Sequence, residues 1–131
     1  MGYTVCFTGH RSIPEEARAS LANELDRVIA ELYSLGADTF ISGGALGFDL
    51  IAACRTARFR AENDGVRLVL ALPCRDQTAR WTDYDSLRAY KMLFSHADEV
   101  HYSDAKLGDD KVKLARIKYR GKGRYIDEIL K

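Results

Sequence analysis

The sequence predicts an α/β fold built on an open, mostly parallel β-sheet. Short apolar runs rich in β-branched and aromatic residues alternate with longer segments in which apolar residues recur every three or four positions. Glycine-rich turns stand where an apolar run gives way to a helical pattern. Strands and helices that alternate in this way form right-handed βαβ units. The length of 131 residues suits one compact domain.

The first strand is expected over Tyr3–Thr8 and the first helix from Ser12 to Leu35. Ser12 is suited to cap this helix, and Pro14 is suited to its first turn. Gly36 is placed to end it. The spacing of its apolar residues predicts one buried helix face. These residues are Ala17, Leu21, Leu25, Val28, Ile29 and Leu32.

The second strand, Thr39–Ser42, runs into the most informative stretch, FISGGALGFDLIAA at 40–53. Its three glycines allow positive φ angles and a close approach to a ligand. The expected helix over 48–61 would present free N–H groups and its dipole to an anion. Such a turn also occurs simply to make a tight corner, so the pattern alone leaves both interpretations open.

The later elements follow the same alternation. A turn at 63–65 precedes a strand over 66–72, which Pro73 ends. A third helix is expected over 83–96, and a fourth strand over 99–102.

A second turn at the end of a strand also carries polar groups. The first strand ends in Thr8 and Gly9, and His10 and Arg11 follow. In an open parallel sheet, ligands bind beyond the carboxyl ends of the strands. We therefore expect this turn and the glycine-rich turn to face the same crevice.

The overall charge does not indicate a nucleic-acid or membrane partner, because 20 Lys and Arg stand against 19 Asp and Glu. Basic residues concentrate in the tail, in KVKLARIKYRGKGR at 111–124. No charged leader opens the chain and no apolar stretch is long enough to span a bilayer. A cytoplasmic location is therefore expected.

The cysteines and histidines do not predict a metal site. Cys6, Cys54 and Cys74 are too few and too far apart for a zinc site or a disulfide framework, and we expect Cys74 to be structural. His96 and His101 follow no metal-ligand spacing. We expect no metal and no cofactor.

Four segments, taken in order, resemble the YpsA-like branch of the SLOG superfamily. They are CFTGHR at 6–11, FISGGALGFDLIAA at 40–53, LVLALPCRDQTARW at 68–81 and ADEVHY at 97–102. The superfamily also includes the LOG phosphoribohydrolases and the DNA-processing protein A group. The resemblance implies a three-layer Rossmann-like open sheet with helices on both faces, which binds a nucleotide or a nucleotide-derived ligand. It implies a nucleotide-binding domain over 1–102, with a basic C-terminal helix or tail over 103–131 as part of the same domain.

The resemblance also implies a ligand site with three walls. Carried over by position, the walls are Thr8, Gly9, His10 and Arg11; then Ser42, Gly43, Gly44, Gly47 and Asp49 on the phosphate side; and Pro73, Gln77 and Trp81. Proteins of this group usually continue into a further strand and a GGT turn that helps to close the site. Here the segment at 122–127 only faintly resembles the start of that continuation, and the GGT turn is absent.

Each of these side chains has a structural alternative. Arg11 suits bidentate binding of phosphate, or a surface ion pair. Asp49 suits a ribose hydroxyl or acid–base chemistry, or a stabilising place in the first helical turn. Trp81 with Gln77 suits stacking on a base, or packing on the core. His10 suits contact with a ligand, or a hydrogen bond within its own loop.

Three classes of function remain open. The first is a module that binds or senses a nucleotide-derived ligand of the ADP-ribose type. The second is an N-glycosidic hydrolase of the LOG type, although the PGGxGTxxE motif of that group is absent and Asp49 is the nearest carboxylate. The third is single-stranded nucleic-acid binding through the basic tail, where Tyr119 and Tyr125 stand among Lys and Arg. An unpaired sheet edge where the family's fifth strand should lie predicts a homodimer.

Overall fold

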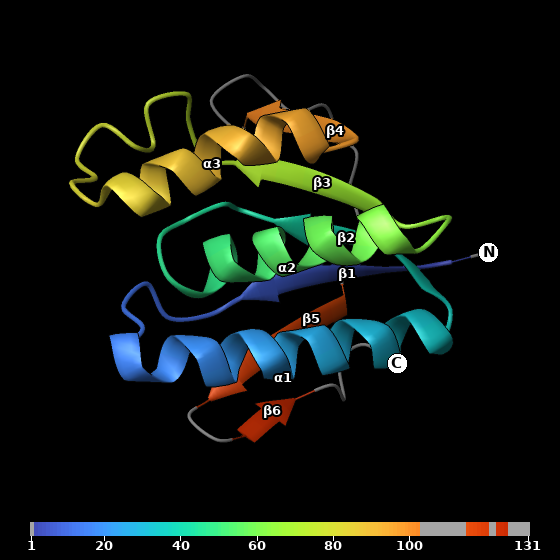
Figure 1. Ribbon diagram of the computed structural model, residues 1–131. Coiled ribbons are helices and arrows are strands. Elements are labelled where there is room, and N and C mark those ends of the chain that lie inside the picture. The colour runs from blue at the N-terminus through green and yellow to red at the C-terminus, as the bar shows by residue number, and fades with distance from the viewer. Residues whose placement is uncertain (1, 103–114, 121–122, 126–131) are drawn as a thin grey trace.

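The computed structural model describes residues 2–102, 115–120 and 123–125, which form a six-stranded sheet with three helices. The strand order is β4-β3-β2-β1-β5-β6, and only β5 and β6 pair antiparallel (Figure 1). The elements in chain order are β1 (Tyr3–Thr8), α1 (Glu15–Ser34), β2 (Ala37–Ser42), α2 (Phe48–Glu62), β3 (Arg67–Leu72), α3 (Tyr84–His96), β4 (Glu99–Tyr102), β5 (Ala115–Arg120) and β6 (Gly123–Tyr125). The predicted α/β arrangement is confirmed.

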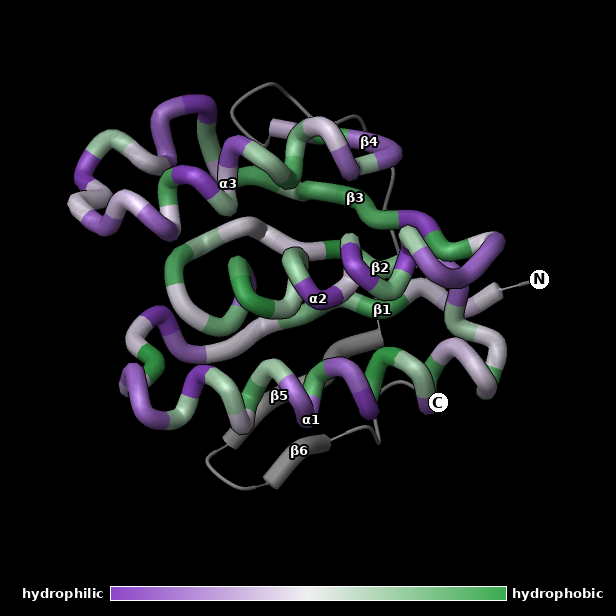
Figure 2. Tube along the Cα trace, viewed as in Figure 1, coloured by the Kyte–Doolittle hydropathy of each residue, from purple (hydrophilic) through white to green (hydrophobic). Residues whose placement is uncertain are grey.

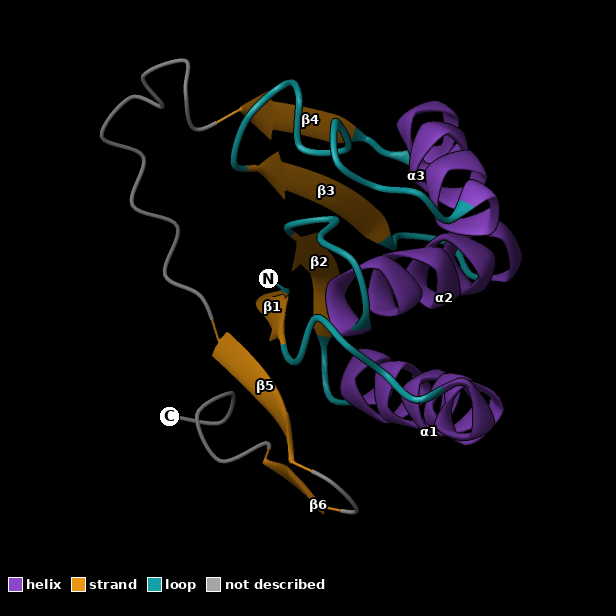
Figure 3. Ribbon diagram, turned by 90° about the vertical axis from the view of Figure 1, so that its left-hand side faces the viewer, coloured by secondary structure: helices purple, strands orange, loops and turns teal. Residues whose placement is uncertain are grey.

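All three described helices cover the same face of the sheet (Figure 3). The chain steps from β1 to β2, β3 and β4 in one direction, and right-handed crossovers taken in one direction place their helices on one side. The second helical layer that we expected is therefore not seen in the part of the chain that the structure describes.

We expected a basic helix or tail over 103–131, and the described residues of this segment, 115–120 and 123–125, form strands instead of a helix. β5 lies parallel to β1, with Thr8 opposite Lys118, and β6 returns antiparallel to β5. Apolar and basic residues alternate in ARIKYR at 115–120, a period of two that suits a strand. β5 occupies the edge of β1 that we expected to be unpaired, so this edge no longer gives a reason to expect a homodimer.

Two clusters of apolar side chains hold the helices on the sheet, and Figure 2 shows hydrophobic residues concentrated along β3 and its neighbours. One cluster joins α1 and α2 to β1 and β2, where the ring of Phe7 stacks on Phe40 at 6.0 Å between centroids. The other joins α2 and α3 to β3. Helix α1 begins at Glu15 after Pro14. Ser12 is therefore not its N-cap, because the chain is still extended at Pro14 (φ −55°, ψ 139°).

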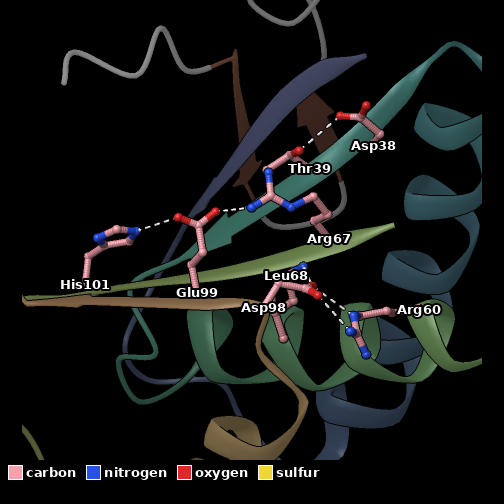
Figure 4. Close-up of polar contacts among 8 residues, drawn as sticks. All are labelled: Asp38, Thr39, Arg60, Arg67, Leu68, Asp98, Glu99 and His101. Atoms are coloured by element: carbon pink, nitrogen blue, oxygen red, sulfur yellow. Dashed lines mark hydrogen bonds and ion pairs between the residues drawn. The ribbon is translucent and has the colours of Figure 1, made fainter. Parts of the chain in front are cut away.

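Polar contacts fix the start of β4 against α2, far from the carboxyl ends of the strands (Figure 4). The Arg60 guanidinium donates to both oxygens of Asp98, at 2.8 and 2.7 Å, and Asp98 accepts the backbone N–H of Leu68 at 2.8 Å. The hydrogen bond from Arg60 is the main reason that the pKa of Asp98 lies below its usual value.

The opposite face of the same strands carries a polar row (Figure 4). Glu99 contacts Arg67 of the neighbouring strand, and its Oε1 lies 3.1 Å from Nε2 of His101. Among the described residues, no group of His, Cys, Asp and Glu is arranged to hold a metal ion. No helix in the described part of the chain combines the length and apolar character needed to cross a membrane.

Candidate functional site

Three loops meet beyond the carboxyl ends of β1, β2 and β3, on the left in Figure 1. They follow these strands at 9–14, 43–47 and 73–83. Parallel strands bring their carboxyl ends to one edge of the sheet, which is where ligands bind in open α/β folds. The sequence placed candidate residues in each of these loops.

The first two loops are joined through Gly47 and Phe48. The backbone N–H of Phe48 donates to the carbonyl of His10 at 3.0 Å. Gly47 has φ +86°, and a Cβ atom there would lie 2.2 Å from the carbonyl oxygen of Arg11. Only glycine permits this close approach, so the two turns do face one crevice.

Ser42 supports the glycine-rich turn from below. Its side chain is fully buried; the hydroxyl donates to the carbonyl of Asp49 at 2.8 Å and accepts the N–H of Gly44 at 3.1 Å. Gly44 has φ +65° and packs against Leu72 and Tyr90. The hydroxyl of Ser42 therefore fixes the shape of the turn from inside the protein.

The tip of this turn offers backbone donors. Among the described residues, the N–H groups of Ala45, Leu46 and Gly47 form no hydrogen bond. They precede α2, whose amino end carries a partial positive charge. Donors and dipole together favour an anion at this position.

Arg11 adds a positive charge beside these donors. The residue is exposed, and its side chain forms no ion pair or hydrogen bond with the residues that the structure describes. It lies close enough to Asp49 to lower the pKa of that carboxyl. An unpaired guanidinium at this place is suited to bind phosphate in a bidentate manner.

Asp49, the second residue of α2, is half-buried beneath the same turn. Its Oδ1 atom is inaccessible to solvent and has no hydrogen-bond partner among the described residues. A Cβ on Gly43 would lie 3.2 Å from Oδ2, so the carboxyl points at the turn. Burial raises the pKa of Asp49 to about 6, against the opposing effect of Arg11.

A cavity of about 380 Å³ lies between the three loops. Arg11 and Leu46 line one side, and the loop after β3 lines the other with Gln77 and Trp81. Trp81 is half-buried and packs edge-on against Tyr90 at 5.2 Å, so it also belongs to the core. The amide of Gln77 donates to the carbonyl of Gly43 at 3.2 Å, which leaves its oxygen for another partner.

The predicted site residues divide into three groups. Arg11, Gln77 and Trp81 line the cavity, whereas Ser42, Gly43, Gly44, Gly47, Asp49 and Gly9 shape the loops around it. A Cβ on Gly9 would lie 2.4 Å from the ring of Phe48, which explains the glycine. Thr8, His10 and Pro73 are exposed and do not line it. His10 contributes its backbone carbonyl.

Several residues that line the cavity were not among the predicted site residues. These are Ala45, Leu46, Cys74, Asp76, Ala79 and Arg80. All of them lie in the two loops that the sequence singled out, so their position after a strand was the available signal. Which side chains of those loops turn inward depends on tertiary packing.

The pKa of Asp49 predicts how stability depends on pH. Because the carboxyl has a higher pKa in the folded chain than the usual value of about 3.9, the folded state binds more protons between about pH 4 and 6. Stability contributed by this group therefore falls as pH rises through that range. Asp49→Asn should be more stable than the wild type at pH 7.5, with the difference vanishing near pH 4. Urea midpoints measured from pH 4 to 8 test this, and a constant difference would contradict it.

A family model described as the YspA SLOG family, YpsA, matches residues 5–117. No curated protein matches the sequence. The match includes all three loops around the cavity. It extends past Tyr102, where we expected the resemblance to end, and reaches into β5.

Proposed function

This chain belongs to the YpsA-type SLOG family, and from that membership and the geometry of the three loops we propose that it binds a nucleotide or nucleotide-derived ligand. The phosphate groups lie against the N–H groups of Ala45 and Leu46, beside Arg11. The base lies against the ring of Trp81. The ligand is of the ADP-ribose type.

The cavity shared by the three loops is the observation that carries this proposal. It brings the guanidinium of Arg11 and the backbone of Ala45 and Leu46, whose N–H groups donate to no described residue, to one wall and the ring of Trp81 to the other. Anions bind at such helix ends, and aromatic side chains stack on bases. Its volume of about 380 Å³ falls within the range of small-molecule sites, about 300–1,000 Å³.

Binding can be followed through Trp81, which is the chain's single tryptophan. ADP should change its fluorescence in a saturable way. Adenosine, which lacks the phosphates, should bind at least about tenfold more weakly, because it forfeits hydrogen bonds to charged groups. Calorimetry with Trp81→Phe checks that the signal reports binding, since phenylalanine keeps an aromatic face. The proposal fails if neither method detects ADP.

Asp49 supports a second candidate, N-glycosidic hydrolysis. A carboxyl with a pKa of about 6 is suited to exchange protons near neutral pH, and it lies beneath the proposed phosphate turn. Under this candidate, AMP incubated with the protein releases adenine, and Asp49→Asn abolishes the release. The binding proposal expects no steady release in either sample. Chromatography of the same mixtures separates the two.

A further inference from the structure

A second cavity of about 230 Å³ lies beside the first and shares Arg11 and Leu46 with it. It is bounded by the segment that leads into α1, by the first turns of α2, and by the start of α3. The two cavities therefore adjoin at Arg11, whose guanidinium we assign to phosphate.

The lining of the second cavity is partly apolar and partly polar. Ile13, Leu50 and Ile51 contribute aliphatic surface, while Arg18, Asp83 and Ser86 contribute polar groups. A sugar ring presents the same two characters, with C–H groups on its faces and hydroxyls at its edge.

Asp83 and Ser86 can each accept further hydrogen bonds from a ligand. Asp83 caps α3: its Oδ1 accepts the N–H of Asp85 at 3.1 Å, and its Oδ2 accepts the hydroxyl of Ser86 at 2.6 Å. A carboxylate has about four acceptor sites, so two remain. The hydroxyl of Ser86 can still accept a hydrogen bond.

The contacts of Asp83 favour its ionised form, in which the carboxylate accepts hydrogen bonds and donates none. The hydrogen bond from Ser86 is the largest of the effects that lower the pKa of Asp83, and Arg18 adds to them. The carboxyl is therefore ionised at neutral pH. Arg18 uses its Nε to donate to the carbonyl of Ile13 at 3.4 Å, and its remaining N–H groups are suited to a hydroxyl or a phosphate oxygen.

We propose that the second cavity binds a sugar, joined through a diphosphate to the nucleotide in the first cavity. This inference rests on the proposed function, because it requires a nucleotide in the first cavity. Arg11 and the N–H groups of the glycine-rich turn hold the diphosphate between the two. Asp83 and Ser86 accept the hydroxyls of the sugar, and Ile13 and Leu50 contact its C–H face. The ligand class is a nucleoside diphosphate sugar.

Calorimetry with ADP and ADP-ribose tests the second cavity. The wild type should bind ADP-ribose about tenfold or more tightly than ADP, as expected for an added hydrogen bond to a charged group. Asp83→Asn removes the charge and keeps a good helix cap. It should reduce the affinity for ADP-ribose to about that for ADP and leave the affinity for ADP unchanged. Asp85→Asn, also in the first turn of α3 and outside the cavity, should affect neither.

The outcomes separate this inference from the proposed function. If the wild type binds ADP and ADP-ribose equally well, the second cavity takes no sugar and the nucleotide site stands. If Asp83→Asn weakens both ligands equally, or Asp85→Asn matches its effect, the sugar subsite is also overturned. If neither ligand binds the wild type, both proposals fail together.

Discussion

Gly47→Ala should destabilise the protein by at least about 3 kcal/mol and abolish measurable binding of ADP. The substitution places a side chain where φ is +86°, which costs about 1–3 kcal/mol by itself. The new Cβ would also lie 2.2 Å from the carbonyl oxygen of Arg11 and 2.5 Å from that of His10. Both are backbone atoms of the other loop, so relief requires the two loops to separate.

Gly65→Ala is the matched control for this prediction. Gly65 has a similar φ of +78°, and a Cβ there meets nothing within 4 Å. It should therefore show only the backbone cost, about 1–2 kcal/mol, with ADP binding intact. Urea denaturation of both variants gives the comparison. Equal losses of stability would mean that the contact between the two loops contributes nothing beyond backbone conformation.

The order of elements through β4 was predictable because local signals agree with the tertiary structure. The apolar spacing from Leu21 to Leu32 matches the buried face of α1, and Glu99–Tyr102 is a strand as expected. β5 was not predicted, because its basic residues indicated a charged tail. Those basic residues in fact alternate with Ala115, Ile117 and Tyr119, a pattern that is typical of a strand. The position of β5 beside β1 is a long-range pairing that no local pattern specifies.

The candidate site was predictable as a set of loops, and less so as a set of side chains. The glycines of the turn at 43–47 carried a local signal because positive φ and close approach exclude other residues. Ser42 and Gln77 had no comparable signal, since their hydrogen bonds to Asp49 and Gly43 depend on how the loops fold back. The second cavity depends on three helix starts that are far apart in the sequence.

Arg11→Ala should weaken binding of ADP by roughly 10- to 100-fold, corresponding to about 1.5–3 kcal/mol for a hydrogen bond to a charged group. The guanidinium lines both cavities and has no ion-pair partner among the described residues. Its loss therefore removes a ligand contact without breaking an ion pair among the described residues, so the stability of the free protein should fall only by the lost electrostatic effect of Arg11 on Asp49. Calorimetric titration and urea denaturation measure the two effects separately. Arg27→Ala is the control, because Arg27 is an exposed residue of α1 outside both cavities, and it should leave binding unchanged.

The same variant should also change the titration of Asp49. Arg11 lowers the pKa of that carboxyl, so its removal should raise the pKa above about 6. The stability advantage of Asp49→Asn over its parent should then keep growing up to a higher pH, and reach a larger value, in the Arg11→Ala background than in the wild type. A contact with phosphate alone would not produce this shift, which reports on the free protein. If Arg11→Ala both weakens ADP binding and changes the pH dependence of the Asp49→Asn effect, Arg11 lies between Asp49 and the ligand. An unchanged pH dependence would place the guanidinium too far from Asp49 for that arrangement, and unchanged ADP binding would remove Arg11 from the site.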